Sequence, residues 1–260
     1  MMLKGCNQRS VSLSPFWRGV EFLFDYNFPR DLSLIGNIYK SIQALSPLTI
    51  PNYVTASSVE KSIYQDGYVF CEFLEGSVVC ETKILPHYID SLEAHISALH
   101  SQFNEHWGSF HSAQFTAEAW PLRLEETIQR LAQHPDNVSL ISEELVSKII
   151  EKVALCRPQK FVPLMLDLRW DQFLETEGNL SALIDLDAFV IGPRELDFVV
   201  LEYLLTDVEC QTFKQRYQEK NDFPDLSTVR APYRLLLFLM NVLGEKNINS
   251  WMESPPRFDR

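Results

Sequence analysis

The chain has 260 residues, of which 46% are hydrophobic and 22% charged, and its formal net charge is −12. This length and composition are typical of a globular protein with a substantial core, and no run approaches the roughly 20 apolar residues of a membrane span. The acidic balance disfavours nonspecific binding to nucleic acid or to anionic membranes, and it fits either a cationic partner or simply a soluble acidic protein.

The cysteines predict a reducing environment. They are odd in number, scattered, and include no Cys-x-x-Cys pair: Cys6, Cys71, Cys80, Cys156 and Cys210. This usage favours free thiols in the cytoplasm over a disulfide framework or a zinc site. The first residues also lack an apolar stretch of signal-peptide length.

The N-terminal third predicts short strands and one helix. Residues 10–13 and 19–26 resemble strands, the second without clean alternation, as in a strand buried on both faces. Apolar residues at helical spacing predict a helix over 31–45, with Asp31 as its N-cap. A turn at 65–67 then predicts a hairpin over 61–74.

The rest of the chain predicts helices around one acidic segment. Pro86 suits the first turn of a helix with a single apolar stripe. Helical periodicity recurs over five later ranges: 122–133, 142–155, 195–205, 210–218 and 227–243. Residues 253–257, rich in proline, predict a loose tail.

The acidic segment, residues 161–198, is the most informative part of the sequence. Two apolar runs, 161–166 and 180–184, each end on an aspartate, Asp167 and Asp185, and a Glu-Gly turn at 177–178 reverses the chain between them. The segment holds eight acids against only two arginines. Acids this close repel one another unless a cation, a basic partner or water screens them. A site for a divalent metal and a solvated hairpin rim both fit the pattern.

Three stretches of this segment resemble the aminoglycoside phosphotransferase and choline-kinase-like family. Residues 166–174 (Leu-Asp-Leu-Arg-Trp-Asp-Gln-Phe-Leu) are similar to the family's catalytic loop. Residues 184–187 (Ile-Asp-Leu-Asp) are similar to its metal-binding turn, and residues 192–197 (Gly-Pro-Arg-Glu-Leu-Asp) to the stretch that opens the next helix. The likeness covers roughly residues 30–245.

The resemblance implies an α+β, protein-kinase-like two-lobe fold. Residues 1–75 would form a small, reduced N-terminal β-rich lobe of strands plus one helix. Residues 76–260 would form a mostly helical C-terminal lobe that carries the hairpin 161–198.

The resemblance also implies roles for residues of the acidic segment, with ATP and Mg²⁺ as cofactors. Asp167 matches the catalytic aspartate, and Asp185 the metal-binding one. Gln172 stands where the family has a metal-binding Asn. Asp187 is a further candidate ligand, or a carboxylate for a cationic substrate. Asp197 matches a residue that more often stabilises the fold.

Other contacts to nucleotide and substrate are also candidates. Residues 72–76 resemble the hinge whose backbone binds adenine, so Glu72 and Leu74 are candidate nucleotide contacts. Lys4 and Arg18 compete as the cation for the nucleotide phosphates. Arg169 and Asp171, in the loop itself, are candidate contacts for the acceptor substrate.

Several departures from the family pattern leave two functions open. Met165 and Leu166 replace the family's His-Gly before the catalytic Asp, and an apolar Met cannot make the hydrogen bonds of that histidine. The chain has no Gly-x-Gly-x-x-Gly loop, and the helix predicted over 31–45 lacks a glutamate to pair with a phosphate-binding lysine. The first function is an ATP-dependent kinase acting on a hydroxyl of a small metabolite, with cationic compounds among the candidate substrates. The alternative is an inactive kinase-like protein that binds a nucleotide, another ligand or a protein partner.

Overall fold

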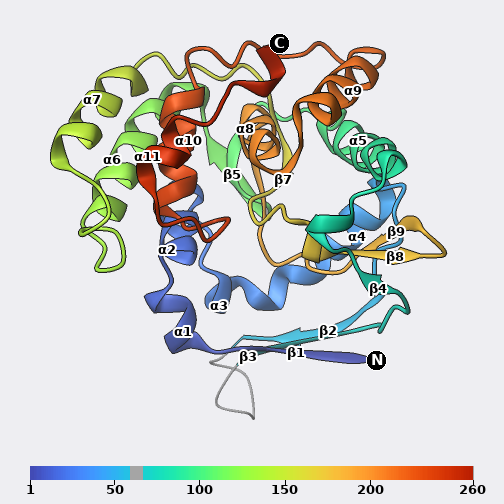
Figure 1. Cartoon of the computed structure of the whole chain (residues 1–260). Coiled ribbons are helices and arrows are strands. Elements are labelled where there is room, and N and C mark those ends of the chain that lie inside the picture. The colour runs from blue at the N-terminus through green and yellow to red at the C-terminus, as the bar shows by residue number, and fades with distance from the viewer. Residues whose placement is uncertain (59–66, 260) are drawn as a thin grey trace.

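The computed structural model describes residues 1–58 and 67–259 (Figure 1). Its N-terminal sheet has the strand order β1–β3–β2 and is antiparallel throughout, with β1 at Met2–Cys6, β2 at Tyr53–Ser57 and β3 at Gly67–Cys71. Figure 1 shows this sheet along one edge of the molecule, away from most of the helices. Strand β3 confirms the second strand of the predicted hairpin, whereas the first strand and the start of its turn lie outside the described residues.

The two strands predicted after β1 are helices, and that prediction was wrong. They are α1 (Gln8–Leu13) and α2 (Pro15–Phe24). Asn7 caps α1 by accepting a hydrogen bond from the Ser10 N–H, and Ser14 caps α2 in the same way from Trp17. A capping side chain starts each helix, and in α2 Pro15 follows at the first turn, where these signals outweigh the β-propensity of the aromatic residues.

The helix predicted over 31–45 is present but begins earlier. It consists of α3 (Phe28–Asp31), a 3-10 turn at Leu32–Leu34, and α4 (Ile35–Leu45). Asn27, not Asp31, is the capping residue, because its side chain accepts from the Arg30 N–H. Among its described residues, the N-terminal part therefore contains four α-helices, more than the one predicted.

Two further antiparallel sheets lie in the rest of the chain. One has the order β6–β5–β10–β7, and the other the order β4–β8–β9. Their strands are β4 (Ser77–Val78), β5 (Trp107–Ser109), β6 (Ser112–Phe115), β7 (Phe161–Met165), β8 (Phe173–Thr176), β9 (Asn179–Leu183) and β10 (Phe189–Pro193). The turn at Glu177 and Gly178, both at positive φ, joins β8 to β9. The first apolar run of the acidic segment instead pairs with β10, so the segment is not one simple hairpin.

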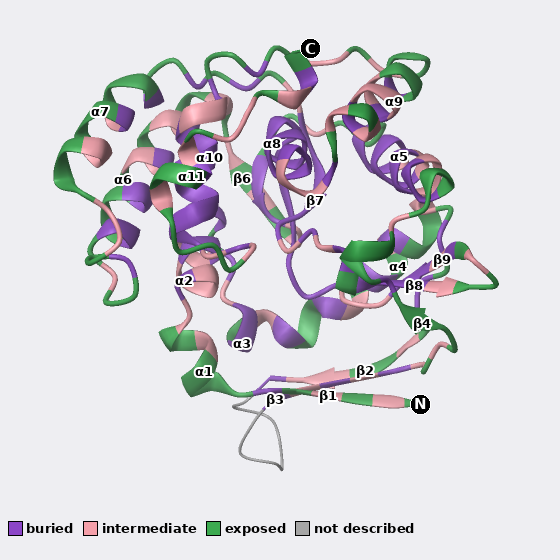
Figure 2. Cartoon of the chain, in the orientation of Figure 1, coloured by how far each residue is buried: buried purple, intermediate pink, exposed green. Residues whose placement is uncertain are grey.

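The predicted helices after Pro86 are confirmed, with small differences at their ends. They are α5 (Pro86–His100), α6 (Trp120–Ala132), α7 (Glu143–Val153), α8 (Glu195–Leu204), α9 (Asp207–Gln218) and α10 (Arg230–Leu239), followed by the short α11 (Ile248–Met252). Figure 2 shows α8 as an almost wholly buried helix near the middle of the fold. Together with the sheets, these helices confirm the predicted α+β class.

The C-terminal tail is packed, contrary to the prediction that it is loose. The Phe258 side chain is fully buried, and Arg234 donates hydrogen bonds to the Ser254 and Pro255 carbonyls. The partner of this arginine is Glu202 on α8, whose side chain is also fully buried. A buried ion pair thus orders the chain end.

Helix α2 ties the N-terminal part to the helices of the rest of the chain. It packs against α6 and α10, and Val20, Leu23 and Phe24 are fully buried there. Gly19 makes the approach close, since a Cβ at that position would lie 2.6 Å from Met240 Cγ. The division into lobes after residue 75 stays a prediction.

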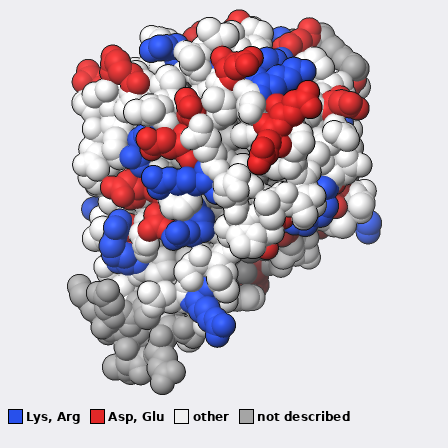
Figure 3. Space-filling model, turned by 90° about the vertical axis from the view of Figure 1, so that its left-hand side faces the viewer, with Lys and Arg blue, Asp and Glu red and all other residues white. Residues whose placement is uncertain are grey.

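The described residues bear on two predictions, those about the cysteines and about membrane spans. All five cysteines are free thiols in the structure, and no described helix has the length and apolar character to cross a membrane. Figure 3 shows one face of the molecule, on which basic and acidic side chains are interspersed.

Candidate functional site

Three aspartates converge on one pocket at the ends of strands. Asp167 follows β7, Asp185 follows β9, and Asp187 precedes β10. The Asp187 N–H donates a hydrogen bond of 3.3 Å to Asp185 Oδ1, which fixes the turn between them. All three line a pocket of about 370 Å³ together with Lys4. The two apolar runs that end on Asp167 and Asp185 in the sequence therefore do open on a common pocket.

Lys4 on β1 completes this group. Its Nζ lies 2.6 Å from Asp185 Oδ1 and 2.5 Å from Asp187 Oδ2. Burial disfavours its charge, but the carboxylates of Asp187 and Asp185 raise the Lys4 pKa above its usual range. Lys4 is therefore a firmly protonated ammonium held between two carboxylates.

The pocket carries more negative charge than its cations offset. Burial raises the pKa of Asp167 to about 6, with contributions from Asp185 and Asp171, although Arg169 and Lys4 act in the opposite direction. Burial and the charge of Asp185 likewise raise the pKa of Asp187. Carboxylates crowded together out of water favour either a bound proton or a further cation.

The donor chemistry at this pocket fits Mg²⁺, which prefers oxygen ligands. Asp185 and Asp187 offer carboxylate oxygens, and Asp187 Oδ1 is buried without a hydrogen-bond partner among the described residues. Gln172 is buried nearby and donates its amide Nε2–H to Asp167 Oδ2 at 3.0 Å. Within residues 1–58 and 67–259, however, no group of three or more His, Cys, Asp or Glu is arranged to hold a metal ion. In this structure the ammonium of Lys4 lies against both carboxylates.

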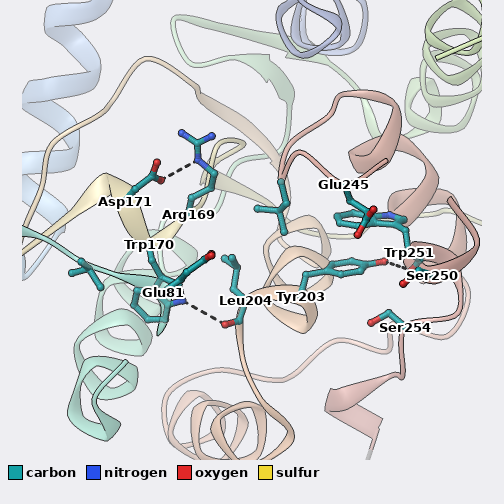
Figure 4. Close-up of a pocket in the computed structure, with 12 residues that line it drawn as sticks. Glu81, Arg169, Trp170, Asp171, Tyr203, Leu204, Glu245, Ser250, Trp251 and Ser254 are labelled. Carbon is teal, nitrogen blue, oxygen red and sulfur yellow. Dashed lines mark hydrogen bonds and ion pairs between the residues drawn. The ribbon is translucent and has the colours of Figure 1, made fainter. Parts of the chain in front are cut away.

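The loop after Asp167 leads to a second, larger cavity of about 540 Å³ (Figure 4). Arg169 Nε lies 3.4 Å from Asp167 Oδ1 and 3.1 Å from Asp171 Oδ1, and both Arg169 and Asp171 line the cavity. Because Asp167 lines the first pocket, this loop connects the two spaces. Arg169 and Asp171 are thus close to the predicted catalytic aspartate.

Sequence reasoning missed most of the cavity wall. Figure 4 shows the rings of Tyr203 and Trp251 on the side opposite Arg169 and Asp171, with Glu245 beside them. The two rings are stacked, with centroids 3.7 Å apart. They belong to α8 and α11, and no motif or spacing relates residues on separate helices.

Other sequence-predicted candidates lie elsewhere. Arg18 sits on α2, pairs with Glu21 at 2.9 Å and lies over the Phe22 ring, so it is not part of the Lys4 pocket. Glu72 is bound to Asn52, both through its carboxylate and through its backbone N–H. Leu74 is half-buried, and neither it nor Glu72 lines the pocket of the aspartates.

Asp197 lies in the core, away from the pocket. Its Oδ2 is 3.0 Å from His100 Nε2, and His100 Nδ1 is 2.9 Å from the Tyr217 hydroxyl. The group joins α5, α8 and α9. Asp197 is therefore a buried core residue that contacts a histidine, and its fold-stabilising role stays a prediction.

Comparison with known proteins identifies the fold. No protein-family profile matches the sequence, and neither does any curated protein. Solved structures do match. The macrolide 2′-phosphotransferase MphH of Brachybacterium faecium is 14% identical, with a TM-score of 0.54 over 87% of this chain and 81% of that one.

Two aminoglycoside phosphotransferases match at similar levels. A thermostable mutant of APH(4)-Ia, in a ternary complex with AMP-PNP and hygromycin B, is 17% identical, with a TM-score of 0.57 over 89% of this chain and 80% of that one. The GDP complex of aminoglycoside 2′-phosphotransferase-IIIa is 16% identical, with a TM-score of 0.53 over 82% and 73%.

These matches show that the chain has a kinase-like fold. More narrowly, the fold is that of the aminoglycoside phosphotransferases, as the sequence motifs predicted, and it is shared by the macrolide phosphotransferase.

Proposed function

We propose that this protein is an ATP-dependent phosphotransferase that acts on a hydroxyl group of a small, cationic molecule. The observation that carries the proposal is the convergence on one pocket of Lys4, from the N-terminal strand, with Asp167 and Asp185, from the acidic segment far along the chain. Phosphoryl transfer needs a cation for the nucleotide phosphates, metal ligands and a carboxylate that orients the acceptor. These three side chains have the chemistry for those three tasks.

Each residue then has a defined role. Asp167, with a pKa raised to about 6 by burial, would orient the acceptor hydroxyl and accept its proton. Lys4 would bind the nucleotide phosphates. Asp185 and Gln172 would hold Mg²⁺, which supplies charge neutralisation for the phosphates when bound. The backbone around Glu72 and Leu74 would contact the base.

The second cavity is the proposed site of the acceptor. Three acids line it, Glu81, Asp171 and Glu245, against a single cation, Arg169. This excess of acidic over basic side chains in the cavity wall favours a positively charged ligand. The stacked rings of Tyr203 and Trp251, which cover one face of each other, give the cavity an apolar wall, and Ser250 and Ser254 add hydroxyl groups for a polar ligand.

A second candidate function is binding of a ligand without transfer. Two observations favour it. The Lys4 ammonium lies against Asp185, the carboxylate that would hold the metal, and Met165 replaces a histidine that braces the loop in the family the sequence resembles. Such a protein would keep the pocket and bind a nucleotide, but it would not hydrolyse or transfer its phosphate.

Incubation with γ-labelled ATP and Mg²⁺, with and without a panel of hydroxylated amines, separates these functions. The kinase proposal expects the wild type to release or transfer label, and Asp167→Asn to lose this activity while still binding ATP. Equal, background activity in both proteins, with saturable ATP binding, would overturn the kinase proposal in favour of the binding protein. Absence of ATP binding would overturn both.

A further inference from the structure

Helix α4, which packs on the N-terminal sheet that carries Lys4, offers no acid to position the lysine, and Glu21 on α2 is paired with Arg18. Protein kinases hold their phosphate-binding lysine in an ion pair with a glutamate of the neighbouring helix. In this chain α4 (Ile35–Leu45) contains no Asp or Glu. Burial raises the pKa of Tyr39 on α4 above its usual range, and the charges of Cys71, Asp187 and Asp185 add to this effect. Its phenol therefore stays neutral. Asp31, on α3, is taken up by Arg30 and by the Asn27 N–H.

Asp187 has the contacts of the missing partner. Its Oδ2 lies 2.5 Å from Lys4 Nζ, and only 7% of its side chain is exposed. No other Lys or Arg of the described residues forms an ion pair with it. Its own N–H is bonded to Asp185, which fixes the backbone of the residue that holds the lysine.

We propose that Asp187 is a positioning residue that anchors Lys4, in place of a helix glutamate, and so holds the ammonium where it meets the nucleotide phosphates. The inference rests on the proposed function. It assigns Asp187 a role different from metal ligation, and it explains why two acids stand in this turn. With Asp187 as the anchor, Lys4 can leave Asp185 to a metal ion and still keep one carboxylate partner.

Nucleotide affinity measured with Mg²⁺ and again with EDTA distinguishes an anchor from a metal ligand. An anchor acts through Lys4, so Asp187→Asn should weaken ATP binding by roughly tenfold under both conditions. The double variant with Lys4→Met should bind no more weakly than Lys4→Met alone, because residues that act through one contact are not additive. Asp136→Asn, at an exposed carboxylate far along the chain, is the charge control.

The metal-ligand alternative gives a different pattern. The anchor proposal is overturned if Asp187→Asn weakens ATP binding only in the presence of Mg²⁺, and if the loss of affinity in the double variant equals the sum of the two single losses in free energy. The proposed function would then still stand. A wild-type protein that does not bind ATP would instead overturn the proposed function.

The reactivity of Lys4 tests the anchor without any nucleotide. An amine held between carboxylates reacts slowly with acetylating reagents, so Asp187→Asn should speed acetylation of Lys4, measured by peptide mass spectrometry. The other lysines should keep their rates, which also shows that the variant is folded. An unchanged Lys4 rate in a folded Asp187→Asn variant would overturn the proposal.

Discussion

The Lys4 ammonium nitrogen lies 2.6 Å from Asp185 Oδ1, although 181 residues separate the two along the chain. Strand β1 makes this contact possible, because its pairing with β3 holds Lys4 against the turn that follows β9. The candidate site therefore depends on the N-terminal sheet as much as on the acidic segment.

The raised pKa of Asp167 predicts how activity depends on pH. A carboxylate must be deprotonated to accept a proton, and burial raises the Asp167 pKa to about 6. We therefore expect kcat/KM for ATP turnover to rise with pH through about 6 and to level off above it. Rates measured from acidic to neutral pH in a buffer of constant ionic strength check this. A flat profile across the range would contradict the assignment of Asp167 as the base.

The buried Glu202 predicts a large effect on stability. Its Oε2 lies 3.0 Å from Arg230 Nε and 2.8 Å from Arg234 Nη2, with its side chain fully buried. Glu202→Ala would leave two arginines without this partner, and breaking such a buried pair costs about 3–5 kcal/mol. Urea unfolding measures the loss, with Glu151→Ala, at an exposed position of α7, as the control. A loss no larger than that of the control would be inconsistent with the packed tail.

The buried His95 predicts a pH dependence of stability. Its Nδ1 lies 2.8 Å from the Ser46 hydroxyl, and burial lowers its pKa to about 4. Below pH 6.5 the unfolded chain binds a proton that the folded protein does not, so the free energy of unfolding falls as the pH drops toward 4. Between pH 7 and 5 this group contributes a loss of about 2 kcal/mol.

Urea unfolding of wild type and His95→Gln at both pH values isolates this contribution. The variant should lose less stability on acidification than the wild type does. Equal losses in the two proteins would show that His95 is not held neutral in the core.

The close approach of α2 to Met240 predicts that Gly19 is required for packing. A Cβ at Gly19 would lie 2.6 Å from Met240 Cγ, so Gly19→Ala should destabilise the protein by about 1–3 kcal/mol. Gly5→Ala is the matched control, since nothing lies within 4 Å of its Cβ. Thermal unfolding compares the two. If both variants melted like the wild type, α2 would not be docked as described.

Local patterns in the sequence predicted much of the fold. Helices α6 and α7 have regular apolar spacing bounded by breaks, and α5 has Pro86 at its first turn, so local chemistry specifies them. Helices α1 and α2 were not predicted, because their starts depend on side-chain caps at Asn7 and Ser14 rather than on a long apolar periodicity. The packed tail was missed because its order comes from Arg234, a partner far away in the sequence.

The residues of the candidate site could likewise be predicted only in part. Asp167 and Asp185 could be found because apolar runs end on them, and Lys4 was one of two candidates from the resemblance. No local pattern could choose between Lys4 and Arg18, because the choice depends on which segment packs over the acidic turn. The aromatic wall of Tyr203 and Trp251 had no signal at all, since it forms only when α8 and α11 meet.

Calorimetric titration of ATP with Mg²⁺ into the wild type and Lys4→Met tests the central claim most directly. The matched control is Lys40→Met, at an exposed lysine of α4. We predict saturable binding to the wild type and to Lys40→Met, and binding at least about tenfold weaker to a folded Lys4→Met. A wild type that binds no ATP, or a Lys4→Met variant that binds it equally well, would contradict the claim that Lys4, Asp185 and Asp167 form a nucleotide-dependent active site.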